Sequence, residues 1–482
     1  RKPNPDAVLA ALNELGSTKE EAIYVGDSEV DLATARNAEL PCALVTWARE
    51  GHDVTLIDKT ADILGTTANQ LDIMCVEGDG AMRSTLIEAN AGGADLVIAC
   101  TGSDETNMLS CLMAKKLGAR RTAARVRNPE YYKQIDFIKN DLGIDVAINP
   151  ELITAEEICR VFIFPAALKI EVFARGRAEL VEFKIDEGSP LDKVTLSALS
   201  HEVKVKALVC AVQRGEEVYI PKGDFRLLAG DRIHVSASHK DIEGFLRAIG
   251  GFREKVKTSM IVGGGRIGYY LAALLLSAGI HVKIIERDEA FCNVLAAALP
   301  EAAVINGDGT DQKLLFEEGI EHADSFAALT GIDEENMVIS LFAQSSGVDK
   351  VVTKINRDSY IDMAGKMGID SIVSPKDVTS SRMVSYARAM ENTVGSSNVE
   401  NMYKILGGSV EALEFIIRDS EAPYIGKPLK DLRLKENSLI GCIVRNRKSI
   451  IPNGDTEIQL GDSVILVTTD SRFNDLKDAF DI

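Results

Sequence analysis

The chain has 482 residues, of which 46% are apolar and 26% are charged, and this composition indicates a globular protein of several domains. Its net charge of −19 and its single tryptophan argue against a broad surface for nucleic acid or anionic lipid, so we expect no nucleic-acid partner. Its eight cysteines include no Cys-x-x-Cys pair, and its longest apolar run, residues 269–280, is shorter than the ~20 residues that span a bilayer. We therefore expect reduced thiols and no membrane-spanning segment.

Near the start of the chain, "IYVGDSEVDLATARNA" (residues 23–38) predicts a buried strand, an acidic loop and a helix. Asp27 and Asp31 in this loop carry the oxygen ligands that Mg²⁺ prefers. Beyond about residue 50 the pattern changes to a nucleotide-binding repeat without phosphatase chemistry.

The first copy of this repeat has polar residues where its predicted strands end. The candidates for ligand contacts are Asp58, Asp79, Thr101, Gly102 and Arg125. A phosphate-binding glycine loop should precede this series, but "CALVTWAREG" stands in its place. We therefore expect the first nucleotide site to be impaired.

A second copy follows at a constant offset of 229 residues, which relates Gly78 to Gly307 and Asn107 to Asn336. In the second copy, short apolar strands such as "SMIVG", "VKIIE", "AAVIN" and "SFAAL" alternate with helical patterns, and this predicts a parallel sheet covered on both faces. Each copy ends in a β-rich stretch with a Gly-Asp turn before a strand, "AGDRIHVSA" in one and "LGDSVILVT" in the other. The predicted fold class is α/β, with two tandem Rossmann-like units, each followed by a small α+β subdomain.

The strongest motif is "MIVGGGRIGYYLA" in the second copy, where Gly263-x-Gly265-x-x-Gly268 lies between a predicted strand and a predicted helix. The first glycine permits a tight turn, the second lets the backbone approach a pyrophosphate, and the third allows close helix–strand packing. Glu286 ends the next strand, 18 residues after Gly268, where an acid suits ribose hydroxyls and favours NAD over NADP. A glycine-rich turn without a ligand is the alternative.

Three further candidates follow later strands of the second copy, where ligands bind in open α/β sheets. Asp308 follows the third strand, and Thr330-Gly331 follows the fourth. Each could equally be a turn or a helix cap. Lys354 ends the fifth strand, where it could meet a phosphate or simply face solvent.

Taken together, "IVGGGRIG", the paired "GDG" turns and the paired "TG-x-DE-x-NM" stretches resemble the TrkA family, the cytosolic regulatory subunits of bacterial Trk/Ktr-type potassium uptake systems. The resemblance covers about residues 48–482 and implies two tandem RCK units. It divides the chain into a front fragment (1–47), a first Rossmann subdomain (48–166) and C-terminal subdomain (167–250), and a second pair (251–395 and 396–482).

The resemblance also implies a function. The protein would bind NAD(H), and ATP or ADP as further candidates, without turning them over. It would form a homo-oligomeric ring on the cytoplasmic face of the membrane and bias the gate of a potassium-translocating subunit. The nucleotide contacts that the resemblance implies are Gly263, Gly264, Gly265, Arg266, Ile267, Glu286, Thr330, Gly331 and Lys354 in the second unit, and Asp58, Thr101, Gly102 and Arg125 in the first.

The front fragment resembles the tail of a haloacid-dehalogenase-type phosphatase of the phosphoglycolate phosphatase kind. The resemblance assigns a phosphate-binding role to Lys2 and a Mg²⁺ role to Asp27 and Asp31. No nucleophilic Asp-x-Asp loop precedes them in this sequence, so covalent phosphoryl transfer is not expected. The fragment is interpreted as a fusion remnant that replaced the first strand and glycine loop of the first unit. Whether "AIYVGD" substitutes for that strand is left open.

Two other functions fit parts of the sequence. An NAD-dependent oxidoreductase would use the same glycine loop, but we find no Tyr-x-x-x-Lys and no convincing His–carboxylate pair for proton transfer. Substrate-dependent NADH oxidation would favour that class. The other alternative is a nonfunctional fusion product that is unable to assemble.

Overall fold

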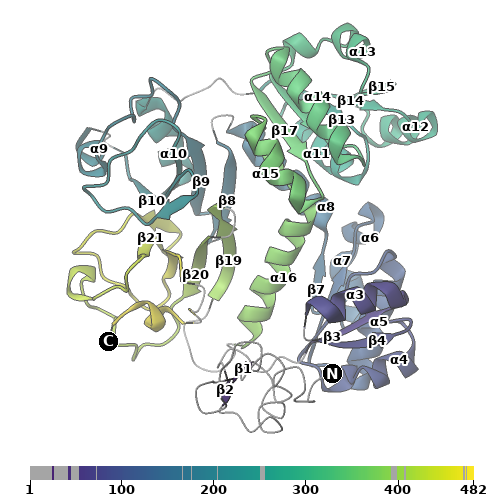
Figure 1. The fold of residues 1–482 in the computed structure, drawn as a ribbon, viewed down its shortest axis with the longest axis horizontal. Helices are drawn as coiled ribbons and strands as arrows, with labels where there is room; N and C mark the ends of the chain where they lie inside the picture. The colour runs from purple at the N-terminus through teal and green to yellow at the C-terminus, as the bar shows by residue number, and fades with distance from the viewer. Residues whose placement is uncertain are drawn as a thin grey trace, which may run out of the picture. The chain divides into compact units, whose positions relative to one another are not determined.

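The computed structural model describes residues 24–26, 42–44, 54–71, 73–164, 167–174, 176–202, 205–249, 256–391, 399–406, 409–470, 473 and 475–481 (Figure 1). The chain divides into two units, residues 1–124 with 140–145 and residues 125–139 with 146–482. In the front fragment, β1 (Tyr24–Gly26) pairs in parallel with β2 (Cys42–Leu44), in a sheet of their own. The predicted strand near residue 23 is therefore present, whereas Lys2, Asp27 and Asp31 lie outside the described residues.

The first copy of the repeat contains two separate pairs of parallel strands. Its elements in chain order are β3 (Thr55–Asp58), α3 (Ala61–Gln70), β4 (Met74–Glu77), α4 (Arg83–Glu88), η2 (Ala91–Gly93), β5 (Leu96–Ala99), α5 (Asp104–Leu117) and β6 (Arg121–Arg125). β3 pairs with β4, and β5 pairs with β6. In the described part of this copy, no strand joins β3 to β5.

The second copy forms one continuous parallel sheet of six strands. Its elements are β13 (Thr258–Val262), α11 (Arg266–Ser277), β14 (His281–Glu286), α12 (Glu289–Ala298), β15 (Ala303–Asn306), α13 (Gln312–Glu317), η3 (Ile320–His322), β16 (Ser325–Ala328), α14 (Asp333–Ser345), β17 (Lys350–Lys354), α15 (Asp358–Lys366), β18 (Ile372–Val373) and α16 (Pro375–Glu391). The strand order is β15-β14-β13-β16-β17-β18, with every pair parallel. This is the doubly wound order, in which β14 and β15 lie on one side of β13, and β16, β17 and β18 lie on the other, so the strand order switches between β13 and β16. The predicted Rossmann-like fold is confirmed.

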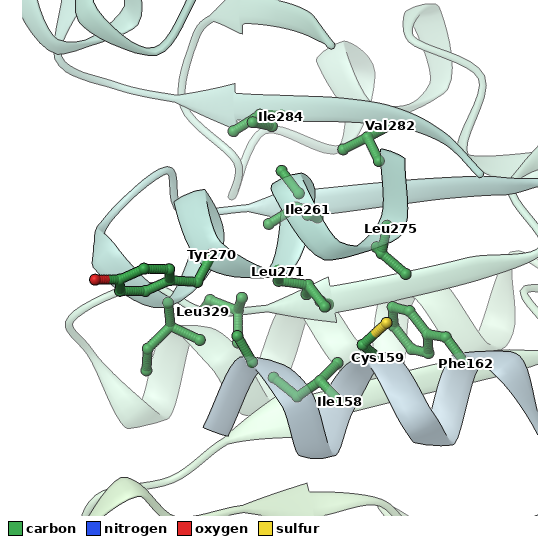
Figure 2. Close-up of a cluster of buried hydrophobic side chains, with 14 of the residues drawn as sticks. Ile158, Cys159, Phe162, Ile261, Tyr270, Leu271, Leu275, Val282, Ile284 and Leu329 are labelled. Atoms are coloured by element: carbon green, nitrogen blue, oxygen red, sulfur yellow. The ribbon is translucent and has the colours of Figure 1, made fainter. Parts of the chain in front are cut away.

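A helix from the end of the first copy packs onto this sheet's first helix. Between β6 and β8 the chain forms α6 (Pro129–Lys133), α7 (Ile135–Leu142), β7 (Val146–Ile148) and α8 (Pro150–Ile163). Figure 2 shows Ile158 and Phe162 of α8 facing Leu271 and Leu275 of α11, in one core cluster. Burying apolar side chains of this size stabilises the fold by roughly 1.5–3 kcal/mol each. This packing accounts for the assignment of α8 to the unit that contains the six-stranded sheet.

Two small antiparallel sheets complete the second unit. The first contains β8 (Lys169–Phe173), β9 (Ala178–Lys184), β10 (Ala207–Arg214), β11 (Glu217–Tyr219) and β12 (Arg232–Ala237), with α9 (Leu196–Glu202) and α10 (His239–Ala248). The second contains β19 (Val399–Ile405), β20 (Val410–Ile416), β21 (Ser438–Arg445), β22 (Lys448–Ile450) and β23 (Ser463–Thr468), with η5 (Leu429–Asp431) and η6 (Leu476–Ala479). Both sheets have the same strand order, and one buried cluster joins them through residues such as Leu180, Cys210, Ala412 and Cys442.

Each of the two Gly-Asp turns noted in the sequence is held by an Asp–Arg ion pair of its own, and the two pairs are equivalent. Asp231 accepts two hydrogen bonds from Arg214, both of 2.8 Å, and Asp462 accepts two of 2.8 Å from Arg445. Both aspartate side chains are buried, and paired hydrogen bonds to a planar guanidinium are the strong form of this contact. Among the described residues, no helix is both long and apolar enough to cross a membrane.

Candidate nucleotide site

The glycine loop lies between the end of β13 and the start of α11, at the point where the sheet order reverses. Gly263 has a φ of +100°, which a residue with a side chain rarely adopts. A Cβ there would lie 2.8 Å from the Leu329 carbonyl, and a Cβ on Gly268 would lie 2.2 Å from the Gly263 oxygen. The first and third glycines therefore serve the tight turn and the close approach of helix to loop, as the motif predicts.

Gly265 is different from these two glycines. A Cβ on Gly265 would meet no described atom within 4 Å, so this glycine leaves space rather than avoiding a clash. Gly265 is also the N-cap residue of α11, where unsatisfied backbone N–H groups face outward. An open backbone at a helix N-terminus is the arrangement that binds a phosphate group.

Glu286 lies directly beside the loop. Its Oε2 accepts a hydrogen bond of 2.9 Å from the Gly264 N–H, and its Oε1 accepts one of 2.9 Å from the Asp288 N–H. The carboxylate is half-buried and fixed at the end of β14. A fixed negative charge here would attract ribose hydroxyls and repel a 2′-phosphate.

Asp308 and Thr330 both shape turns at the same edge of the sheet. Asp308 is exposed, and hydrogen bonds from the Thr310 N–H (2.9 Å) and hydroxyl (2.8 Å) hold the pKa of its carboxyl below the usual range. The Thr330 N–H donates to Asn336 Oδ1 at 2.9 Å. Each residue therefore has the structural role that was the alternative to ligand binding.

Asn336 was not among the predicted site residues, yet it organises this edge. Its buried side chain also donates to the carbonyls of Thr330 (3.2 Å) and Lys354 (3.0 Å), which ties the Thr330-Gly331 turn to the end of β17. A Cβ on Gly331 would meet no described atom within 4 Å, so the turn is open on its outer side.

The remaining charges come from β17 and from α8. Lys354 is half-buried, and burial lowers the pKa of its ammonium group, while Asp333 and Glu151 act in the opposite direction. Burial raises the pKa of Glu151, in the first turn of α8, against the effect of Arg127, Arg266 and Arg125. Arg125, the last residue of β6, belongs with residues 146–482, and its charge acts on Glu151 together with the charge of Arg266 from the glycine loop.

Comparison with known proteins decides the family. The TrkA-N domain model matches residues 43–150 and 259–375, and the TrkA-C domain model matches residues 180–250 and 413–481. The Trk system potassium uptake protein TrkA homolog of Archaeoglobus fulgidus is 32% identical over 429 residues, 89% of this chain and 95% of that protein. TrkA of Halomonas elongata is 33% identical over 430 residues, 88% of this chain and 92% of that protein. The chain belongs to the TrkA family.

Solved structures agree with this fold. The GsuK RCK domain aligns with a TM-score of 0.57 at 18% identity, over 92% of this chain and 91% of that chain. The GsuK channel bound to NAD aligns with a TM-score of 0.56 at 17% identity, over 92% of this chain and 76% of that chain. At such identities the likeness establishes the tandem fold alone. A haloacid dehalogenase-like hydrolase model also matches residues 1–45, as the resemblance of the front fragment predicted.

The first copy of this TrkA-family chain repeats most of the second copy's geometry. The Gly78 N–H donates to the Asp58 carbonyl at 2.9 Å, as the Gly307 N–H does to the Glu286 carbonyl. Strand register thus places Asp58 at the position of Glu286, an offset of 228 rather than 229. The Thr101 N–H donates to buried Asn107 at 2.7 Å, which matches the Thr330 turn.

The surroundings of Gly102 and Asp79 in the first copy are similar to those of Gly331 and Asp308 in the second copy. A Cβ on Gly102 would meet no described atom within 4 Å, and Asp79 accepts a hydrogen bond of 2.9 Å from the Ala81 N–H, the counterpart of the Asp308 turn. Asp79 also forms an ion pair of 2.9 Å with Lys59. What the described part of this copy does not contain is a strand and glycine loop equivalent to β13 and residues 263–265.

Proposed function

We propose that this chain is a nucleotide-binding regulatory subunit whose second copy binds NAD(H) and whose occupancy biases the gate of a potassium-translocating membrane subunit. The single observation that carries the proposal is the open backbone at Gly265, at the reversal point of the six-stranded sheet and beside the Glu286 carboxylate. The names of the TrkA relatives support the potassium-uptake context, and the fold shared with an NAD-bound channel is consistent with it.

The roles of the chain's own residues follow from their positions. The N–H groups at the start of α11 would bind the pyrophosphate over Gly265, and Arg266 and Lys354 would add positive charge. Glu286 would exchange its hydrogen bond from the Gly264 N–H for the hydroxyls of a ribose, which favours NAD(H) over the 2′-phosphorylated cofactor. ATP or ADP shares the adenosine and phosphates and would use the same loop.

NAD(H) acts in this proposal as an effector, not as a hydride donor, and the protein is not an enzyme. Bound nucleotide would favour one arrangement of a ring of copies on the cytoplasmic face of the membrane. It can shift the gate only by its difference in affinity for the two arrangements, and each factor of 10 corresponds to about 1.4 kcal/mol.

Titration calorimetry of NADH on the full chain tests the binding step. We expect one site per chain, because the first copy lacks its glycine loop among the described residues. The Gly265→Asp variant should not bind, since its carboxylate would occupy the space of the pyrophosphate. Two sites would show that the first copy has rebuilt a pocket, and no binding, or consumption of NADH in the presence of a substrate, would refute the sensor function.

Potassium flux tests the regulatory step. A Trk-type membrane subunit would be reconstituted in vesicles, and flux would be measured with no added subunit, with this chain, and with Gly265→Asp. We expect NADH to change the flux only with the unmodified chain. Equal responses with the chain and the variant would separate nucleotide binding from gating and contradict the proposal.

A further inference from the structure

We propose that ion pairs between the first small sheet and the second Rossmann subdomain form a junction that salt weakens, so that the conformation of the chain responds to ion concentration. Asp370, two residues before β18, is at its centre. Asp370 accepts a hydrogen bond of 2.8 Å from Arg232 of β12, and bonds of 3.1 and 3.3 Å from the ammonium group of Lys184 of β9. Arg232 also donates to Glu182 of its own sheet at 3.0 Å, which orients the guanidinium. These contacts, the Asp370 junction, join elements 138 and 186 residues apart in the chain.

Lys350, the first residue of β17, makes a second contact between the same two parts of the chain. Its ammonium group donates at 2.5 Å to the carbonyl of Ala167, in the segment that leads from α8 to β8. Lys350 is 5% exposed, whereas Arg121, which begins β6 at the equivalent position of the first copy, is exposed. The accessibility of the Lys350 amine therefore reports whether this junction is closed.

The equivalent acid of the first copy has its partners within its own copy. The sequence "GID" precedes the last short strand in both copies, so Asp145 corresponds to Asp370. Asp145 accepts hydrogen bonds from Lys115 at 2.9 Å and from Arg121 at 2.7 Å. The Rossmann fold can thus satisfy this acid locally, and in the second copy the small sheet supplies its partners instead.

The two basic residues are particular to the first small sheet. Arg232 and Lys184 lie opposite each other on β12 and β9, and the residues in the same register of the second small sheet are Ser463 and Ile416. The two sheets share their strand order and their Gly-Asp turns, so the fold does not require a charge at these positions. The contact with Asp370 accounts for the two charges.

The exposure of these side chains makes the junction sensitive to salt. The side chains of Asp370, Arg232 and Lys184 are 31%, 30% and 40% exposed. Ion pairs with such exposure are screened by dissolved ions, because the Debye length falls from about 10 Å at 0.1 M to about 3 Å at 1 M. None of the apolar clusters formed by the described residues combines side chains of the first small sheet with side chains of the six-stranded sheet. Within these clusters, burial of apolar surface therefore does not compensate for weakened ion pairs.

A junction that opens as salt rises would respond to the ions that potassium uptake accumulates. Only this consequence depends on the proposed function, because the salt response itself follows from the contacts of Asp370 and Lys350.

Amine labelling of the full chain with acetic anhydride, quantified by mass spectrometry, measures how often the junction opens. The rate at Lys350 would be normalised to that at the exposed Lys448. We expect slow labelling of Lys350 in 50 mM KCl and labelling at least about threefold faster in 1 M KCl. NaCl should have the same effect as KCl, because screening depends on ionic strength and not on the identity of the cation.

Three variants complete the test. Asp370→Asn should label at Lys350 in 50 mM KCl as fast as the unmodified chain does in 1 M KCl, and should no longer respond to salt. Lys184→Gln removes a contact from the other side of the junction and should change the labelling in the same direction, which guards against local misfolding around Asp370. The control, Asp455→Asn, removes an exposed ion pair of 2.7 Å with Lys430 in the second small sheet and should leave Lys350 unchanged.

Three results would overturn the proposal: labelling of Lys350 that does not change with salt, a response to KCl without one to NaCl, or equal effects of Asp370→Asn and Asp455→Asn. The second result would indicate a specific potassium site in place of screening. These measurements use neither NADH nor potassium flux, so a failure of this proposal can be distinguished from a failure of the proposed function.

Discussion

A comparison of Gly265→Ala with Gly268→Ala tests two different roles of glycine in the loop. We expect Gly265 to leave space for a ligand, whereas Gly268 avoids a clash with the protein backbone. A methyl group on Gly268 would lie 2.2 Å from the Gly263 carbonyl oxygen, more than 1 Å closer than an ordinary contact. The clash is with backbone, so α11 must move away from the loop. Such overpacking costs about 1–3 kcal/mol, of which the better helix propensity of alanine offsets at most about 1 kcal/mol.

A methyl group on Gly265 meets no described atom within 4 Å, and the φ of −50° at this position is allowed for alanine. The stability of Gly265→Ala should therefore stay within about 1 kcal/mol of the unmodified chain, the range for a changed N-cap residue. Its affinity for NADH should fall at least tenfold, which is about 1.4 kcal/mol, because the methyl group occupies the space that a pyrophosphate needs.

Thermal unfolding with and without NADH measures both quantities. At a concentration 100 times the Kd, NADH stabilises the unmodified chain by about 2.7 kcal/mol, and a tenfold weaker Kd reduces this to about 1.4 kcal/mol. Gly268→Ala should unfold earlier even without NADH, and Gly265→Ala should lose mainly the response to NADH. An unchanged response in Gly265→Ala would show that no phosphate lies over this glycine, and the assignment of the site would be wrong.

Three further changes test other parts of the structure. Asn336→Ala should destabilise the second Rossmann subdomain by about 2–3 kcal/mol in urea unfolding, because buried backbone groups at two strand ends lose their partners. Asp462→Ala should cost about 2–4 kcal/mol because it leaves Arg445 without its buried partner, and adding Arg445→Ala should recover part of this loss. Burial and the nearby Glu171 raise the pKa of Glu157 from 4.5 to about 7, so the folded chain binds the extra proton and stability should fall as pH rises from 4.5 through 7. This fall should be smaller in Glu157→Gln, and an equal pH profile would contradict the assignment.

The parts of the site that the sequence predicted are those encoded by local spacing. The glycine loop follows a short apolar run and precedes a helical pattern, so the roles of Gly263 and Gly268 could be assigned from three glycines and their neighbours. The Thr330 turn was found because the same residues recur 229 positions earlier. In both cases the residues that contact one another are close in the chain or repeated within it.

The parts that were missed depend on contacts between distant elements. Asn336 was noted in the sequence only as the repeat of Asn107. Its structural role arises because β16 and β17 are neighbours, so that its side-chain amide can donate to the carbonyls of both Thr330 and Lys354. Glu151 reaches the charges around the second glycine loop because α8 packs on α11, more than 100 residues further along the chain. No local pattern near Glu151 indicates this. Similarly, the Gly-Asp turns were visible in the sequence, but their arginine partners on β10 and β21 were not.

The repeated geometry of the first copy also changes what its polar residues mean. Asp79 and Asn107 hold their turns through contacts within the copy, without any ligand, so their presence in both copies follows from the fold alone. Thr101 and Gly102 are placed by the same turn. Open space at a glycine does not distinguish a binding site by itself, because an added Cβ on Gly102 or Gly331 would also meet no described atom within 4 Å. Gly265 differs from both because it is the N-cap residue of α11, in the loop that follows β13. Since the described part of the first copy has no counterpart of this glycine, we expect its matching turns and acids not to form a second nucleotide site, and we predict a stoichiometry of one NADH per chain.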